Sequence, residues 1–118
     1  MVVDASNDRR TDVLLHALAD PTRRDIVRRT LTGEQSVSQL ARTYPVSFAA
    51  IQKHVSTLER AGLVAKRRHG REQLVGARIE AIHEARQALD GLEELWRTRI
   101  HRIDRILTEP TQGAPPCP

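Results

Sequence analysis

The sequence predicts a mainly α-helical fold with a small β-hairpin, namely a winged helix-turn-helix of five helices and a two-stranded wing. Three observations lead to this prediction. Two helical segments are joined by a connection of four residues, 43–46, a short basic hairpin follows them, and a long amphipathic segment comes after the hairpin. The length of 118 residues is that of one domain.

The chain is expected to begin with a flexible stretch and two short helices. Residues 1–10 are polar, so the ordered domain is expected to span 11–108 and to start with a helix after Thr11. Asp20 can cap a second helix. Pro21 suits the first position of that helix, because the N–H that proline lacks would have no partner there.

The next two helices form the helix-turn-helix. Ser36 is the expected cap of a helix over 37–42, and Pro45 prevents that helix from continuing. Ser47 is the expected cap of a longer helix that reaches Ala61. The buried face of this longer helix is predicted to consist of Ile51, Val55 and Leu58.

A hairpin and a long helix are expected to complete the domain. Strands over 63–68 and 71–77 flank a turn at His69 and Gly70. A helix is then expected from Ile79 to about Leu107. Residues 109–118 include four prolines and are expected to form a disordered tail.

The excess positive charge of the chain lies in one segment. Residues 42–71 contain seven lysines and arginines but one acidic residue, Glu59, so this segment carries +6 while the whole chain carries +4. A basic patch on a neutral body is typical of a protein that binds nucleic acid. A merely solvated charged face is the alternative.

The helix after Ser47 is the expected reader of DNA sequence. In a helix-turn-helix the second helix enters the major groove, where its exposed residues reach base edges. Gln52 can pair with adenine, and Lys53 with guanine or a phosphate. His54 suits a packed, hydrogen-bonded position as well as a DNA contact. The expected contacts of this helix are Ser47, Ala49, Gln52, Lys53, His54 and Ser56.

The hairpin is the second expected contact with DNA. The run over 66–71 itself contains no acidic residue to pair with its basic side chains, so these side chains are expected to reach phosphates or a narrow minor groove. Gly70 permits the tight turn. The expected contacts of the hairpin are Lys66, Arg67, Arg68 and Arg71.

The last helix is the expected site of dimerisation. Its apolar residues recur at intervals of three and four, which suits packing against a partner helix. A domain of this size would leave such a stripe exposed as a monomer. The expected homodimer interface consists of Leu89, Leu92, Trp96, Ile100 and Ile103, with Leu14 and Leu18 from the first helix.

Three stretches of the chain resemble the ArsR family of winged-helix regulators. Residues 18–26, LADPTRRDI, resemble the opening motif of that family, and residues 47–58 are similar to its recognition helix. Residues 61–64, followed by 67–71, resemble its wing. The resemblance covers about residues 12–107. It implies a homodimeric bacterial repressor that pairs through its first and last helices. Two copies of the expected reader helix would enter successive major grooves of duplex DNA, so a palindromic operator is expected.

The resemblance also implies that a metal often triggers release of DNA, but the ligand patterns of the family are incomplete here. Members that sense soft metals carry two cysteines in the third helix, where this chain reads VSQL over 37–40. Other members carry zinc ligands on the last helix as two pairs. In this chain His101 and Asp104 stand at the positions of the second pair, whereas Ala88 and Asp90 stand at the positions of the first. No metal site and no cofactor are therefore expected. A weak zinc site formed by Asp90, His101 and Asp104 across a dimer is the alternative.

Other classes of protein fit the sequence less well. The chain shows no Gly-rich phosphate loop, no nucleophile beside a base and no carboxylate pair in a predicted pocket, so an enzyme is not expected. It has no apolar run of 18 residues and no signal-peptide pattern, and its single cysteine, Cys117, fits a reducing cytoplasm. The leading hypothesis is a metal-independent repressor, with its own promoter as one candidate target. A winged-helix protein-interaction module is the alternative from another class.

Overall fold

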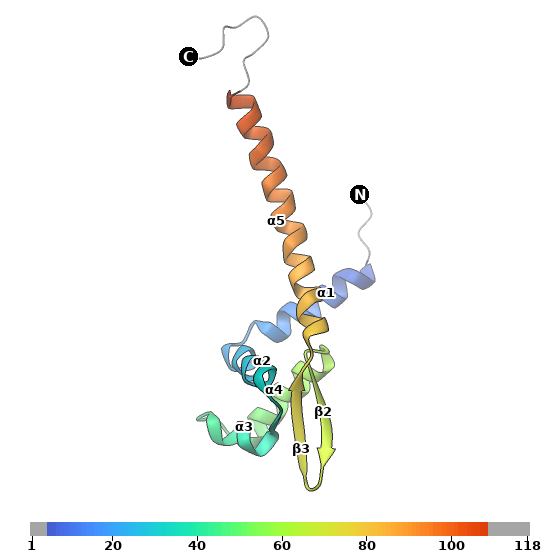
Figure 1. Ribbon diagram of the computed structural model, residues 1–118, viewed down its shortest axis with the longest axis vertical. Coiled ribbons are helices and arrows are strands. Elements are labelled where there is room, and N and C mark those ends of the chain that lie inside the picture. The colour runs from blue at the N-terminus through green and yellow to red at the C-terminus, as the bar shows by residue number, and fades with distance from the viewer. Residues whose placement is uncertain (1–4, 109–118) are drawn as a thin grey trace, which may run out of the picture. The chain divides into compact units, whose positions relative to one another are not determined.

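The computed structural model describes residues 5–108 of the chain, with side chains over 7–107. It confirms a mainly helical winged helix-turn-helix with five helices. The elements in chain order are α1 (Ala5–Leu18), α2 (Pro21–Thr32), β1 (Gln35–Ser36), α3 (Val37–Thr43), α4 (Phe48–Arg60), β2 (Val64–His69), β3 (Glu72–Ala77) and α5 (Ile79–Thr108). All of them except β1 are labelled in Figure 1. The chain divides after Ala85 into two compact units.

The first unit is built around one apolar core. The predicted stripe of α4 is confirmed, since Ile51, Val55 and Leu58 are buried. Val64 of β2 and Val75 of β3 are buried in the same core, so the strands pack against helices through one face. Because the stripe of α4 faces inward, the opposite side of this helix is left for solvent or for a ligand.

The sheet has three strands instead of the predicted two. Its order is β1-β3-β2, and both pairings are antiparallel. The additional strand contributes the pairs Gln35 with Val75 and Ser36 with Leu74. A strand of two residues has no hydrophobic alternation to reveal it, so the sequence pattern could not predict β1.

Two predicted helix caps are confirmed in atomic detail. The Ser36 hydroxyl accepts from the Gln39 backbone N–H at 3.0 Å, and the Gln39 side chain accepts from the Ser36 N–H at 2.8 Å. The Ser47 hydroxyl accepts from the Ala50 N–H at 3.1 Å at the start of α4. Gly62 follows α4 with a φ of +76°, as expected of a glycine terminator.

The first helix begins earlier than predicted. It starts at Ala5 instead of after Thr11, so the prediction of a flexible segment over 1–10 is wrong for residues 5–10, while 1–4 lie outside the described residues. Arg10 explains part of the difference, because its Nε donates to Glu84 Oε2 of α5 at 2.9 Å. Polar residues here form a helix that an ion pair fastens to the start of α5.

The second unit contains the rest of α5, which is exposed over almost its whole surface. Five apolar side chains stand out there with exposed fractions between 42% and 64%: Leu89, Leu92, Trp96, Ile100 and Ile103. Two ion pairs lie along the same helix, Arg86 with Asp90 and Arg97 with Glu93, and the partners of each pair are one helical turn apart. Among the described residues no helix is long and apolar enough to cross a membrane.

Candidate nucleic-acid interface

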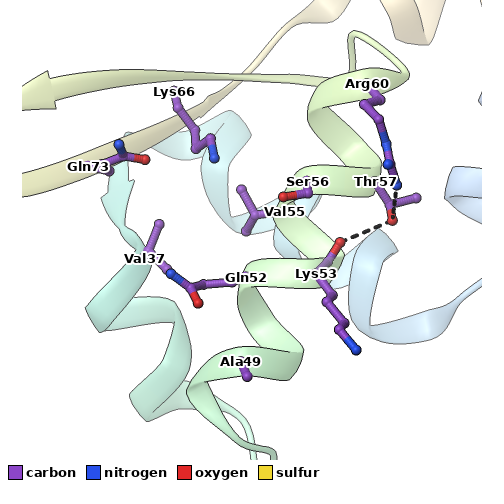
Figure 2. Close-up of a pocket in the computed structure, with 10 residues that line it drawn as sticks. All are labelled: Val37, Ala49, Gln52, Lys53, Val55, Ser56, Thr57, Arg60, Lys66 and Gln73. Atoms are coloured by element: carbon purple, nitrogen blue, oxygen red, sulfur yellow. Dashed lines mark hydrogen bonds between the residues drawn. The ribbon is translucent and has the colours of Figure 1, made fainter.

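A hollow of about 670 Å³ lies between α4 and the hairpin of β2 and β3. We call it the α4–wing hollow. It brings together five of the predicted contact residues, namely Ala49, Gln52, Lys53, Ser56 and Lys66. Its other lining residues are Val37, Val55, Thr57, Arg60 and Gln73 (Figure 2). The recognition helix and the wing therefore share one concave surface.

The outward residues of α4 are placed by its buried stripe. Ala49, Gln52 and Lys53 are exposed, and Ser56 is half-buried at the wall of the hollow. Figure 2 shows the Gln52 side chain extending from α4 toward Val37, while the Lys53 side chain extends away from Val37. Helical periodicity alone was sufficient to predict these positions.

Three polar residues of the hollow were not among the expected DNA contacts. Thr57 donates to the Lys53 carbonyl at 3.0 Å, and Arg60 donates to the Thr57 hydroxyl at 3.5 Å. Thr57 and Arg60 follow Lys53 at i+4 and i+7, so the helical period that identified Lys53 could also have identified them. Gln73 requires the strand register, which places it opposite Arg68.

The α4–wing hollow is positively charged. Lys53, Arg60 and Lys66 line it, and the first turn of α4 contains no acidic residue. Glu59 lies nearby, with its Oε1 at 3.4 Å from Lys66 Nζ. Basic side chains gathered around one hollow favour an anionic ligand such as a phosphate.

Strand alternation divides the basic run of the wing between two faces. Successive residues of a strand point to opposite sides, so Lys66 and Arg68 share one face while Arg67 shares the other with His69. Lys66 lines the α4–wing hollow, and its face is therefore the one that Arg68 continues toward the tip. Arg71 follows the turn at Gly70, whose φ is +64°, and is exposed.

Arg67 is engaged with protein on the other face. Its Nε donates to Glu34 Oε2 at 2.8 Å and its terminal N–H donates to Glu34 Oε1 at 2.7 Å. The Arg67 guanidinium lowers the pKa of Glu34, and the carboxylate raises the pKa of Arg67. The expectation that no acidic residue pairs with the basic run is therefore wrong. Glu34 precedes β1, which the sequence did not reveal.

His54 occupies the packed position that was one of its two predicted alternatives. Arg23 donates to His54 Nδ1 at 3.3 Å and to the backbone carbonyls of Ala17 and His16 at 2.7 and 3.1 Å. His54 Nε2 lies 4.0 Å from Asp20 Oδ2, and Asp20, although it is the N-cap of α2, makes no side-chain capping bond. His54 thus links α4 to the junction of α1 and α2 and does not line the α4–wing hollow.

A polar cluster fastens the connection before α4 to α2. The Tyr44 hydroxyl donates to Asp25 Oδ2 at 2.6 Å, and Arg29 Nε donates to the same oxygen at 2.8 Å. These two hydrogen bonds lower the pKa of Asp25. Burial and the bond to Asp25 raise the pKa of Tyr44 to about 12. Arg29 also lies over the Tyr44 ring, with its Cζ at 5.7 Å from the ring centroid.

The predicted dimer residues do not all remain available to a partner. Leu14 is 1% exposed and belongs to the core of the first unit, so its assignment to a dimer interface is wrong. Leu18 is partly buried against the same core. The apolar residues that α1 does expose are Val13 and Leu15. The five predicted residues of α5 are all exposed.

The candidate zinc ligands are spread along α5. Within the described part of the chain, no group of three or more histidine, cysteine, aspartate or glutamate side chains comes close enough to hold a metal ion. His101 and Asp104 line a shallow hollow of about 330 Å³ together with Trp96, Arg97 and Ile100 of the same helix. Asp90 does not line it.

Known proteins share this arrangement of motifs. A helix-turn-helix domain model matches residues 18–67, from the end of α1 into β2. The HTH-type transcriptional regulator Rv2034 of Mycobacterium tuberculosis is 45% identical over 65 residues, which are 55% of this chain, and the match spans 61% of the length of that relative. An ArsR-like transcriptional regulator from Rhodococcus sp. RHA1 is 30% identical with a TM-score of 0.76, over 86% of this chain and 96% of that one. The chain belongs to the ArsR-like winged helix-turn-helix regulators.

A more distant solved structure shares the fold. The homodimeric winged helix-turn-helix DNA-binding domain of Mb0332 from Mycobacterium bovis is 20% identical, with a TM-score of 0.63 over 80% of this chain and 92% of that one. At this identity the likeness establishes the fold alone. It extends over most of the described elements of the ArsR-like chain.

Proposed function

We propose that this ArsR-like chain is a sequence-specific, DNA-binding transcriptional repressor. One observation carries the proposal: α4 exposes Ala49, Gln52 and Lys53 beside a hollow bordered by three basic side chains. Exposed polar side chains on a helix-turn-helix recognition helix read base edges, and adjacent cations bind the phosphates. The names of its relatives, which describe transcriptional regulators, agree with this proposal.

In the proposed complex the two walls of the α4–wing hollow have different tasks. The first half of α4 enters the major groove, where Gln52 pairs with adenine and Lys53 with guanine or a phosphate. The sugar-phosphate backbone passes through the hollow, where Arg60 and Lys66 neutralise it. Arg68 and Arg71 extend this contact along the wing.

The proposed repressor acts as a homodimer. The exposed apolar stripe of α5 supports this, because such a stripe favours packing against a second copy. Two-fold symmetry would place the two α4 helices in successive major grooves about 34–36 Å apart, so the operator would be an imperfect palindrome. Repression would follow from occlusion of the polymerase, without a metal ion, in the bacterial cytoplasm.

The proposal predicts that base contacts and phosphate contacts can be separated by mutation. Gln52→Ala should weaken operator binding by about 1–3 kcal/mol and leave binding to random duplex nearly unchanged. Arg68→Ala and Arg71→Ala should each weaken binding to both DNAs. Each lost phosphate contact should reduce the log–log salt slope by about one, or by about two per dimer. The measurement is a titration of each variant against both duplexes across a salt series.

The operator for these titrations comes from a footprint on DNA upstream of the chain's own gene or from selection on random duplexes. Glu72→Gln is a suitable control, since it changes an exposed side chain of the wing outside the α4–wing hollow. Absence of binding to any duplex at low salt would refute the proposal and favour a protein-interaction module. Loss of operator binding alone by Arg71→Ala, with equal losses for Gln52→Ala on both DNAs, would reverse the two tasks.

A further inference from the structure

We propose that Glu34 is a positioning residue that orients the wing through its ion pair with Arg67, and that Arg67 does not contact DNA. This inference rests on the proposed function. Arg67 presents two N–H groups to two carboxylate oxygens at 2.8 and 2.7 Å. Such a two-point contact fixes the orientation of both planar groups, whereas a single contact leaves them free to rotate.

Glu34 contacts both strands of the wing. On β2 it pairs with Arg67, and on β3 it lies against the backbone of Gly76. A Cβ atom at Gly76 would stand 3.2 Å from Glu34 Cγ, so the glycine is what allows this close approach. Glu34 also directly precedes β1, whose Gln35 pairs with Val75 of β3. The Glu34 carboxylate is therefore held in a defined position beside Arg67 and Gly76 of the hairpin.

Two ion pairs hold the hairpin from opposite faces at neighbouring residues. Lys66 pairs with Glu59 of α4 on the face of the α4–wing hollow, and Arg67 pairs with Glu34 on the other face. Beyond these two residues, positions 68–73 are exposed. The direction in which Arg68 and Arg71 extend is thus set where the hairpin leaves the core.

A direct role of Arg67 on DNA makes the opposite prediction. If Arg67 bound a phosphate, Glu34 would compete for its guanidinium and would repel the DNA. Removing the charge of Glu34 would then strengthen binding. If Glu34 positions the wing, the same change weakens binding, because Arg68 and Arg71 lose their fixed direction. One substitution therefore separates the two roles.

The test compares Glu34→Gln with Glu72→Gln in the full chain. Glu72 is exposed on the same face of the wing as Arg67, so its substitution removes an equal charge and spares the Glu34–Arg67 pair. Glu34→Gln should weaken binding to operator and random duplex about tenfold at 0.15 M salt and should reduce the salt slope by about one per subunit. Glu72→Gln should bind no more weakly than the wild type. Tighter binding by Glu34→Gln would overturn the inference.

Charge exchange provides a second arm. The double variant Glu34→Arg, Arg67→Glu keeps an ion pair with its charges reversed, and it should recover binding to within about threefold of the wild type. Arg67→Glu alone should remain weak. If the double variant melts like the wild type but binds as weakly as Arg67→Glu, a phosphate contact by Arg67 is established and the inference is wrong.

A measurement without DNA keeps the inference separate from the proposed function. Amide hydrogen exchange over residues 68–73 should accelerate at least about threefold in Glu34→Gln, while exchange in α4 stays unchanged. Unchanged exchange in the wing would overturn the positioning role, whatever the DNA affinity. Accelerated exchange in a protein whose wild type binds no duplex would sustain the positioning role and refute the proposed function.

Discussion

At the scale of single residues, the Tyr44 hydroxyl joins the helix-turn-helix to α2. Tyr44 stands between α3 and α4, and it shares the Asp25 carboxylate with Arg29. A hydrogen bond to an ionised acceptor is stronger than one between neutral groups. This hydrogen bond therefore helps to hold the connection between α3 and α4 against α2.

We predict that Tyr44→Phe lowers the free energy of unfolding by about 1 kcal/mol at pH 7, because the half-exposed cluster loses one charge-assisted hydrogen bond. The pKa of Asp25 is lowered in the folded chain, so the stabilisation is present above its unfolded pKa and is lost as the pH falls through the folded pKa. Urea unfolding at pH 7 and pH 3 measures the effect. A difference between the two proteins that stayed constant with pH would contradict this account.

Adjacent residues of the same type can have different roles, and the two arginines of the wing show why their roles could not be distinguished from the sequence. Arg67 and Arg68 are adjacent and chemically identical, yet strand alternation sends them to opposite faces. The basic run predicted a DNA-contact surface as a region, and the strand register divides that region between two faces. The partner of Arg67 comes from 33 residues away, and no local pattern encodes such a distance.

At the scale of elements, the apolar stripe of α5 has a symmetric spacing. From Trp96, apolar residues follow at four and seven positions in both directions, at Leu92 and Leu89 and at Ile100 and Ile103. With about 100° per residue, all five lie within about 40° of Trp96 around the helix. A two-fold axis near Trp96 would bring Leu89 beside Ile103 of the partner subunit, with the two helices antiparallel.

This geometry predicts a specific pattern of cross-links. In a Cys117→Ser background, a mixture of Leu89→Cys and Ile103→Cys chains should form a disulfide dimer, whereas Leu89→Cys alone should not, because a two-fold axis at Trp96 separates like residues. Ile100→Glu should yield monomers and abolish operator binding. The control Ile106→Glu, off the stripe, should stay dimeric by sedimentation. Cross-linking of Leu89→Cys with itself would indicate parallel helices instead.

Elements with strong local signals were predicted well, and those fixed by tertiary contacts were not. The caps Ser36 and Ser47 defined α3 and α4 to within a residue or two, because capping is a local hydrogen bond. The start of α1 was missed because its polar residues are stabilised through Arg10 and Glu84, 74 positions apart. Leu14 was misassigned for a similar reason. Periodicity identifies an apolar face but does not tell which surface covers it.

At the scale of the whole molecule, we predict that the proposed repressor needs no transition metal. Zinc titration against a chromophoric chelator should reveal no stoichiometric site of nanomolar affinity, because such sites require three or four well-placed ligands. Operator affinity should be unchanged by equimolar zinc. Stoichiometric zinc binding with release of DNA would contradict this. His101→Ala and Asp104→Ala would then identify the ligands, with His83→Ala as the control.

The exposed stripe of α5 also determines how the proposed repressor would respond to its own abundance. If two chains must meet before a pair of α4 helices can span an operator, the amount of active protein at low concentration rises with the square of the chain concentration. A modest fall in synthesis then produces a larger fall in operator occupancy. Hydrophobic side chains far from the DNA would in this way set the threshold at which a promoter is silenced.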